Sequence, residues 1–509
     1  MALPAVALSA EALSAAGARC HNRPMPNEPR PGPTAFVLAG GGTKGSFEVG
    51  VLQYLVGVEG IAPDIITATS AGAIAATVLA QARTLPEFLD RVNEIEGDVL
   101  AWTQTEHVFG KQAWLGALDG TALGREIHQE ITEGTRPPFP LTPSTVLAGN
   151  EVVPACDAGR KGRRQARKAR RKRQRHLARL VAGAGLRLPR VRRQLRSSGS
   201  SVLNLNPLEG ALRHGSEDGV RAVDPDLIAR PGLQLRLAVT ALRAGVLRYV
   251  TEDGTLVESD ARTPAPAESA GPVDLVDGAI ASASVPMVFP PHPMADDDYV
   301  DGGVIEIVPV SAAAALGATR IIAVVAVPLR LPRDERDYAA APAGYIGLRS
   351  MGMIGVAERQ ISNLNIHLPE GTTLTTVDPV VDVVGLFEIE PGLLRINKDY
   401  GWLRAADLLA DGDADIRADI ADGTHAIVEA RREAWRLEES LWAAGRIAEN
   451  DAGTLALVRE HKEGVRMLVD RRKQLGFPVP DGCEDWWTGY EAHTAERPQG
   501  LPLCSSDRH

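Results

Sequence analysis

The first part of the chain alternates short apolar runs with stretches of helical periodicity. "TAFVLA" (34–39) predicts a buried strand, and the apolar positions of "FEVGVLQYLVGVE" (47–59) recur with helical spacing. The pattern then repeats, with a predicted strand over 65–68 and a predicted helix from Ala71. Strands that alternate with helices in this way predict an α/β fold with a mostly parallel sheet, covered by helices on both faces.

The later segments continue this pattern and then change. "LQLRLAVTALRAGVLRYVTEDGTLVE" (233–258) predicts a strand and a hairpin, 273–284 predicts a helix, and "YVDGGV" (299–304) predicts a strand that ends in a tight turn. Beyond about residue 330 the pattern is mainly helical. One helical face there repeats every seven residues at Val428, Trp435 and Trp442, which is typical of a packed helix.

These patterns divide the chain of 509 residues into a core over 34–330 and a mainly helical C-terminal extension over 331–509. Residues 1–33 are rich in Pro and Ala and lack a basic start, so we expect a disordered leader and not an export signal. No apolar run is long enough to span a bilayer. The four cysteines are scattered without pair or metal spacing, which is typical of a reducing compartment.

Charge is unevenly distributed along the chain. The net charge is −10, yet 160–196 holds 17 Lys and Arg and no acidic residue. Without those 17, the chain has 38 basic against 65 acidic residues, a net charge near −27. Because the basic segment also has poor hydrophobic periodicity, we interpret 157–200 as a basic insertion in the core.

Ser70 stands where a predicted strand meets a predicted helix, in the sequence Ala68-Thr69-Ser70-Ala71-Gly72. In α/β hydrolases a nucleophilic serine occupies such a turn, with small residues two positions away on either side because strand and helix pass closely. The helix start also offers backbone amides and a positive dipole to developing negative charge. A second interpretation is a small-residue turn in which Ser70 only caps the helix.

A glycine-rich loop, Gly40-Gly41-Gly42-Thr43-Lys44-Gly45, follows the first predicted strand and opens a helix. As a dinucleotide loop it lacks a well-placed acidic partner, because Glu59 precedes the second strand. As a P-loop it lacks a Ser or Thr after Lys44. The amides of Gly41 and Gly42 would instead suit an oxyanion hole.

A serine nucleophile needs a base, and we choose Asp301 at the end of a predicted strand, in "YVDGG". Asp277, in the similar "LVDGAI", falls inside a predicted helix and has no strand end to project from. His292 and His367 have no supporting motif. We therefore expect a Ser–Asp dyad ahead of a triad that includes histidine.

In this order, "GGGTKG" (40–45), "ATSAG" (68–72) and "DGG" (301–303) resemble the patatin-like phospholipase family, over about residues 34–330. "NPLEGAL", "ASASVPMVFPPH" and "PVSAAAALGATRIIAVVAV" also look like this family. The resemblance implies a three-layer α/β sandwich with a mostly parallel central sheet. It implies phospholipase A or lysophospholipase-like cleavage of lipid carboxylic esters through an acyl-enzyme, with no metal and no other cofactor.

The resemblance also implies roles for individual residues. Ser70 would be the nucleophile, and Asp301, in a turn with Gly302 and Gly303, would be the base. Ala68 and Gly72 would flank the serine in its elbow. The oxyanion hole would come from the glycine loop, that is from Gly40, Gly41, Gly42, Thr43, Lys44 and Gly45.

Three positions depart from the family's pattern. Lys44 replaces the usual arginine, which keeps the charge and loses the planar fork. Ala68 replaces the first glycine of the elbow, and Ile307 stands where the family often has asparagine. None of these removes a reacting group, so we expect an active enzyme. The alternative is a catalytically silent member that binds lipid or another partner.

The expected partners are a lipid substrate and, through 160–196, an anionic membrane surface. The same segment is also consistent with a solvated loop against the acidic remainder of the protein. It lacks interleaved aromatic residues that stack bases, so we expect no specific nucleic acid partner. We expect a cytoplasmic protein with a peripheral membrane contact, and the sequence leaves the oligomeric state open.

Overall fold

The computed structural model of the chain describes its residues in several ranges. The predicted leader lies outside them up to residue 31, and of the predicted basic insertion over 157–200 only Val191 is described. The described residues are 32–102, 104–122, 124–125, 191, 201–215, 221–265, 272–295, 297–331, 346–409, 414–443 and 452–492.

A sheet of nine described strands forms the centre of the protein, in the order β11-β10-β1-β2-β5-β6-β7, with β9 paired to β5 and β8. Strands β11, β10, β1, β2 and β5 run parallel, and β6 to β9 are antiparallel to their neighbours. Their bounds are β1 Thr34–Leu38, β2 Ile65–Thr69, β5 Gln234–Ala241, β6 Val246–Thr251, β7 Leu256–Glu258, β8 His292–Met294, β9 Asp297–Asp301, β10 Arg320–Val324 and β11 Thr373–Val377. Strands β3 (Gly110–Lys111) and β4 (Leu203–Asn204) form a separate pair.

Helices lie on both faces of this sheet and continue after it. The longer ones are α2 Ser46–Leu52, α3 Ala71–Leu79, α4 Leu85–Ala101, α10 Asn206–His214, α12 Leu275–Ser282, α13 Val310–Ala315, α15 Gly355–Leu364, α16 Pro391–Leu409, α17 Ala414–Ala443 and α18 Ala452–Gln474. The short ones are η1 Gly42–Gly45, η2 Gln53–Val58, η3 Thr105–His107, α5 Ala113–Gly116, α11 Pro225–Ile228, η6 Gly302–Val304, η7 Leu348–Ile354 and α19 Asp485–Thr488. None of the described helices is apolar over a length that could cross a bilayer.

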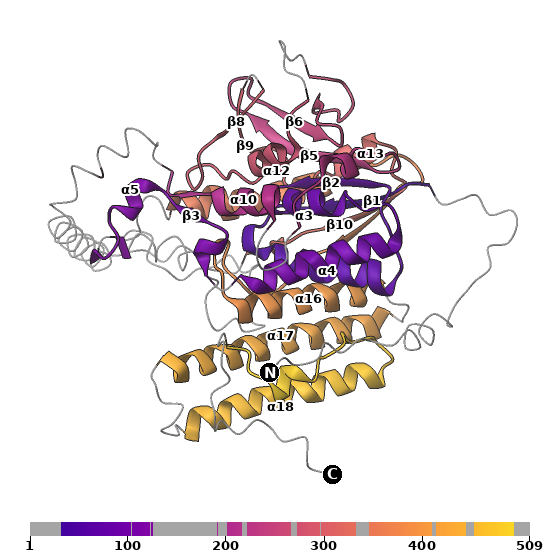
Figure 1. Cartoon of the computed structure of the whole chain (residues 1–509). Helices are drawn as coiled ribbons and strands as arrows, with labels where there is room; N and C mark the ends of the chain where they lie inside the picture. Colours follow the sequence, from indigo (N-terminus) through magenta and orange to yellow (C-terminus); the bar gives the residue numbers. More distant parts are fainter. Residues whose placement is uncertain are drawn as a thin grey trace, which may run out of the picture. The chain divides into compact units, whose positions relative to one another are not determined.

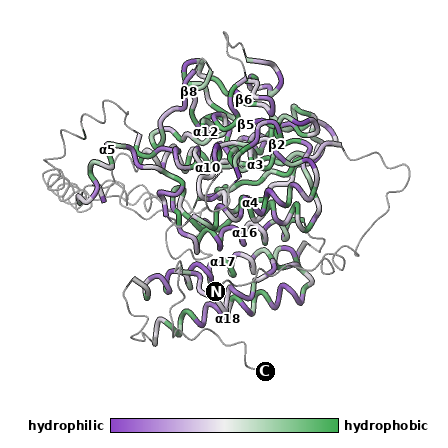
Figure 2. The backbone as a smooth tube through the Cα atoms, in the orientation of Figure 1, coloured by the Kyte–Doolittle hydropathy of each residue, from purple (hydrophilic) through white to green (hydrophobic). Residues whose placement is uncertain are grey.

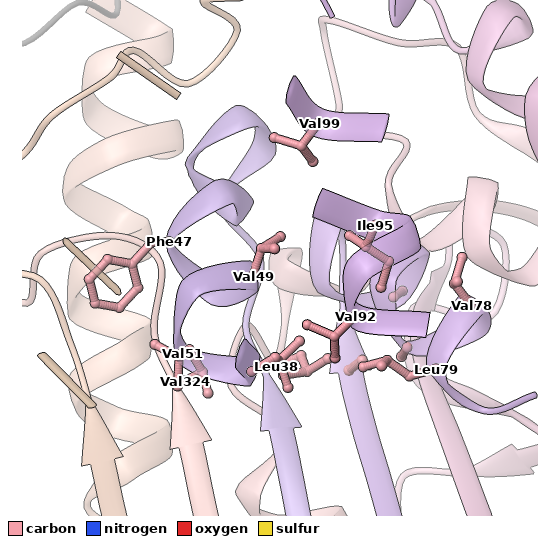
Figure 3. Packing of buried hydrophobic residues seen from close by; sticks show 14 of the residues in the cluster. Leu38, Phe47, Val49, Val51, Val78, Leu79, Val92, Ile95, Val99 and Val324 are labelled. Atoms are coloured by element: carbon pink, nitrogen blue, oxygen red, sulfur yellow. The ribbon is translucent and has the colours of Figure 1, made fainter. Parts of the chain in front are cut away.

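The alternation of side chains along β1 explains the three layers. Phe36 and Leu38 belong to a core cluster with α2, α3, α4, α12 and α16 on one face of the sheet. Ala35 and Val37 belong to a second cluster with residues of α13 and α15 on the other face. Figure 3 shows the first cluster, where Leu38 packs among apolar side chains of α2 and α4. The predicted α/β sandwich with a mostly parallel sheet is therefore confirmed.

Residues after 330 are mainly helical, as predicted, but they also contribute to the sheet. Strand β11 pairs in parallel with β10 and forms one edge of the sheet. Helix α16 packs closely against α2. A Cβ on Gly50 would collide with the Lys398 backbone, and one on Gly401 would collide with the Phe47 backbone, so this close approach requires glycine at both positions. Helices α16, α17 and α18 follow one another away from the sheet in Figure 1.

Helix α17 contains the predicted seven-residue stripe. Val428 and Trp435 are buried, while the side chain of Trp442 lies outside the described residues. Arg431 on the same helix is buried and pairs with Asp399 of α16 and with Glu491. Figure 2 shows the mixed hydropathy of α18, in contrast to the hydrophobic strands of the sheet. The stripe is thus a packed helix face, held also by buried ion pairs.

Candidate active site

Strand β5 brings Ser70 and Asp301 together. Its residue Ala238 pairs with Thr69, the last residue of β2, and the next residue, Val239, pairs with Asp301, the last residue of β9. Ser70 directly follows Thr69. Neighbouring residues of one strand therefore place the serine and the aspartate side by side, although the chain between them is more than two hundred residues long.

Ser70 has the backbone conformation of a strained turn. Its φ of 56° and ψ of −127° lie outside the regions that residues with a side chain favour. The amide of Ser70 donates to the Ser282 hydroxyl at 2.9 Å, and that hydroxyl donates to the Ala238 carbonyl at 2.6 Å. The Ser70 side chain makes no capping hydrogen bond to α3, so the interpretation of Ser70 as a simple helix cap is wrong.

The Asp301 carboxylate accepts a hydrogen bond from the amide of Gly303 at 2.7 Å and lies near the Ser70 side chain, with which it lines one cavity. Both side chains are nearly buried, with 5% of each residue exposed. Burial raises the pKa of Asp301 from its ordinary value to about 6, against the opposing effects of the nearby Ser70 hydroxyl, the Gly303 amide and Arg359. The carboxylate is therefore mostly ionised at neutral pH and a stronger base than an exposed aspartate.

The glycine loop passes beside the serine. A Cβ on Gly40 would stand 2.7 Å from the Ser70 Cβ and 2.5 Å from the Ile307 Cδ1, closer than real contacts allow. Gly42 has a φ of +55°, and a Cβ there would meet the carbonyl of Leu386. The loop can therefore approach Ser70 only because position 40 is glycine, and Leu386 only because position 42 is glycine.

Backbone hydrogen bonds distinguish the residues within the predicted oxyanion stretch. The amide of Gly40 donates to Ile307, Thr43 to Leu386 and Lys44 to Gly41. Among the described residues, the amides of Gly41 and Gly42 have no acceptor. Gly40, Gly41 and Gly42 also line a cavity together with Ser70. The amides open to a ligand in this loop are thus those of Gly41 and Gly42.

The side chains of Thr43 and Lys44 point away from the serine. Lys44 forms a buried ion pair with Asp382, and the Thr43 hydroxyl donates to the Gly385 carbonyl at 2.6 Å. Asn397 of α16 donates to the Lys44 carbonyl at 3.2 Å. In this chain, the lysine that stands in place of the usual arginine anchors the glycine loop to the C-terminal residues.

The two small residues that flank the serine elbow differ in their surroundings. Ala68 is fully buried in β2, between Leu38 of β1 and Leu237 of β5, and its methyl group is accommodated. A Cβ on Gly72 would stand only 2.5 Å from the Leu38 carbonyl oxygen. The elbow therefore requires glycine at position 72 and accepts the alanine found at position 68.

The turn after Asp301 is equally crowded. A Cβ on Gly302 would meet the Ala238 carbonyl, and one on Gly303 would stand 2.9 Å from the Asp301 Oδ1. Ile307 fills the space between this turn and the glycine loop. Its amide and that of Val308 donate to the Asn363 side chain, at 3.0 and 3.2 Å. Asn363 of α15 thus accepts the hydrogen bonds of two amides in this loop, where Ile307 stands at the position expected to hold asparagine.

The histidines considered for a triad lie elsewhere. His292 contacts Asp277 at 3.0 Å, and Asp277 also pairs with Arg213. The two residues that were considered and not chosen as the base therefore contact each other. His367 is exposed. Among the described residues, no histidine lines the cavity that holds Ser70 and Asp301. Geometry thus supports the choice of a dyad.

Two cavities meet at Ser70. The dyad cavity, of about 300 Å³, contains Ser70, Asp301 and Gly40 to Gly42, together with Arg359 of α15. The second cavity, of about 130 Å³, lies on the side of α2, α3 and α4 and includes Glu48 and Asp98. Sequence reasoning missed Arg359, Glu48 and Asn363, because none belongs to a motif and only the folded chain brings them to the site.

The chain resembles known proteins at the level of a family and only weakly at the level of single proteins. No curated protein matches the chain significantly. The crystal structure of VipD from Legionella pneumophila is similar to this chain at 12% sequence identity, over 87% of this chain and 86% of that one. Its TM-score is 0.25, which supports no conclusion about the fold. Residues 36–314, more than half of the chain, match the family model of the patatin-like phospholipases, and the chain therefore belongs to that family.

Proposed function

We propose that this protein is an active lipid acyl hydrolase that cleaves carboxylic esters through Ser70 and Asp301. The observation that carries this proposal is the position of Ser70 beside the buried Asp301 carboxylate, in a cavity lined by the glycine loop. A nucleophile beside its base, next to amides that have no acceptor among the described residues, is the arrangement that acyl transfer requires.

In the first half of the reaction, the Ser70 Oγ attacks the ester carbonyl carbon and its proton passes to the Asp301 carboxylate. The carbonyl oxygen becomes an oxyanion, which the amides of Gly41 and Gly42 stabilise. The tetrahedral intermediate then expels the alcohol, which takes the proton from Asp301. The acyl group remains on Ser70 as an ester.

In the second half, Asp301 accepts a proton from a water molecule that attacks the acyl-enzyme. The tetrahedral intermediate uses the same two amides, and Ser70 recovers its proton from Asp301 as the fatty acid leaves. Burial favours this role, because a pKa of about 6 makes Asp301 a better proton acceptor than an ordinary aspartate. Ala68 does not oppose it, since Ser70 has the strained elbow conformation with alanine in place.

Lipid esters fit the surroundings of the dyad. The lining of both cavities is mainly apolar, with Val285 and Phe387 common to the two and further aliphatic and aromatic side chains in each. Such walls favour a hydrocarbon chain over a polar acyl group. Met287 and Val304, at the edge of the dyad cavity, are about half exposed and extend its apolar lining toward solvent.

Labelling with a fluorophosphonate probe tests the nucleophile directly, because the probe forms a stable bond only with an activated serine. We expect the modified peptide to contain Ser70 and the label to be lost in Ser70→Ala. Hydrolysis of a p-nitrophenyl ester should fall to background in Ser70→Ala and in Asp301→Asn. Ser9, outside the described residues, offers a matched Ser→Ala control that should keep full labelling.

The silent alternative makes the opposite prediction. A family member that only binds lipid or a partner would react with the probe no faster than a surface serine. Its ester turnover would be the same in the parent and in both variants. Either result would contradict the proposed function.

A further inference from the structure

An ester has two arms, and Ser70 stands between two spaces that could receive them. Gly42, Ser70, Val285 and Phe387 line both the dyad cavity and the second cavity. When the carbonyl carbon lies at the Ser70 Oγ, the acyl chain and the alcohol diverge from it. The two cavities therefore raise the question of which arm each one takes.

The charges of the two cavities differ. Arg359 is the one cationic side chain among the described residues that line the dyad cavity. The second cavity carries the carboxyl groups of Glu48 and Asp98, and none of its described lining residues is a lysine or arginine. Both oxygens of Glu48 are buried and lack a hydrogen-bond donor among the described residues. A buried phosphate would therefore find no lysine or arginine among the described residues of this cavity and would be poorly accommodated there.

The shape of the second cavity suits a hydrocarbon chain. Its walls include the aliphatic side chains of Val49, Ile74 and Val99 and the aromatic rings of Trp102 and Phe109. These residues come from the helices on one face of the sheet and from the segment that follows α4. Burial of each CH₂ group in such surroundings favours binding of a longer chain.

Arg359 lies at the wall of the dyad cavity, beside a glycine one turn before it. Gly355 also lines this cavity, and a Cβ there would stand 3.3 Å from the Arg359 Nη1. The guanidinium therefore lies against bare backbone at the cavity wall, close enough to Asp301 to influence its charge. Arg359 follows the family match, which ends at residue 314.

We propose that Arg359 binds the phosphate of a phospholipid or lysophospholipid head group, so that the alcohol arm leaves from the dyad cavity while the acyl chain occupies the second cavity. A guanidinium offers a phosphate two parallel hydrogen bonds, which a neutral glycerol head group cannot accept in the same way. This inference rests on the proposed ester hydrolysis and adds a residue that recognises the phosphate and the orientation of the substrate at Ser70.

Two lipids that differ only in the phosphate test the role of Arg359. We would measure kcat/KM for oleoyl-lysophosphatidic acid and for monooleoylglycerol at about pH 8, well above the Asp301 pKa of about 6. In Arg359→Gln, the preference for the phosphate-bearing lipid should fall about tenfold or more, and Arg359→Lys should recover part of it. Arg395, an exposed arginine of α16 outside both cavities, provides the control Arg395→Gln, which should keep the parent's preference.

Each other outcome contradicts the proposal. An equal loss on both lipids in Arg359→Gln, with an unchanged Tm, would make Arg359 a positioning residue for the dyad and not a phosphate ligand. Parent protein that cleaves neither lipid, or prefers the neutral one, would exclude this substrate class. Ester hydrolysis that still depends on Ser70 would in that case preserve the proposed function.

The acyl arm has its own test at Ala75, a residue of α3 that lines the second cavity. Ala75→Phe should fill this cavity and lower the ratio of p-nitrophenyl oleate to p-nitrophenyl acetate hydrolysis about tenfold, because acetate does not need the space. An unchanged ratio in a variant that folds with the parent's Tm would show that the chain binds elsewhere. The orientation proposed here would then be wrong.

Discussion

Lys44 and Asp382 form an ion pair that is almost completely buried, although 338 positions separate them in the chain. The lysine belongs to the glycine loop beside Ser70, and the aspartate lies between β11 and α16. The same segment accepts hydrogen bonds from the amide and hydroxyl of Thr43. The C-terminal residues therefore hold the loop that would form the oxyanion hole.

Removal of one partner of this pair should be costly. Lys44→Met leaves Asp382 buried without its cation, and we expect the free energy of unfolding to fall by about 3–5 kcal/mol. The double variant Lys44→Met/Asp382→Leu should lose less than the sum of the single changes. Chemical denaturation measures this cycle. Arg471→Met, which breaks the exposed pair with Asp419, is the control and should cost at most about 1 kcal/mol. Additive effects would contradict a coupled pair.

Gly40 should not tolerate a side chain. Gly40→Ala places a methyl group against Ser70 and Ile307, which must move, so we expect ester hydrolysis to fall by about a hundredfold or more. Gly45→Ala should lose much less, because its Cβ would meet only the Ala71 Cβ, at 3.6 Å. Gly97→Ala, in open space on α4, controls for the exchange itself. Equal activities in Gly40→Ala and Gly97→Ala would contradict the close approach of loop and serine.

Asn363 should be needed for the loop that follows Asp301. Asn363→Ala removes the acceptor for the buried amides of Ile307 and Val308, and we expect a loss of about 1–3 kcal/mol in the free energy of unfolding. Activity should also fall, because Ile307 packs against the dyad's turn. Asn365→Ala, at an exposed position two residues later, should change stability by no more than about 0.5 kcal/mol. Thermal and chemical denaturation of both variants, with ester assays, checks this.

The pH dependence of the reaction should follow the ionisation of Asp301. Burial raises its pKa to about 6, and only the ionised form accepts the Ser70 proton. We expect kcat/KM for a neutral ester to fall about tenfold per pH unit below pH 6 and to level off above it. Asp301→Asn should show a low rate without this inflection. An inflection near the ordinary aspartate value of about 4 would contradict a buried, desolvated base.

Glu48 should make the protein less stable as the pH rises. Burial raises the pKa of Glu48 well above its ordinary value, so the unfolded chain releases this proton at a lower pH than the folded protein does. Ionisation of the unfolded state alone then favours unfolding over the pH range between the two pKa values. Relative to the parent, Glu48→Gln should gain up to about 1.4 kcal/mol per pH unit across that range.

Denaturation between about pH 5 and pH 8 measures this difference for Glu48→Gln and for Glu370→Gln, a change at an exposed position. The Glu370 variant should follow the parent at every pH. A constant difference between Glu48→Gln and the parent would mean that Glu48 is already ionised in the folded protein.

Local patterns of the sequence were sufficient to predict the core and the two residues proposed to react. Short apolar runs and helical spacing predicted β1, β2, α3 and the strand that ends at Asp301. Ser70 and Asp301 were identifiable because a strained elbow and a turn after a strand each need small residues within a few positions. These requirements concern neighbouring residues, so they can be recognised in short segments of the sequence.

Only the tertiary structure decided what surrounds these groups. The pairing of β5 with both β2 and β9 brings Ser70 to Asp301. Side chains far from any motif complete the site: Arg359 lines the dyad cavity, Asn363 holds the neighbouring loop, and Asp382 anchors the glycine loop. Burial, ion pairing and cavity shape depend on contacts between distant segments. No spacing along the sequence records them, because they exist only once the chain has folded.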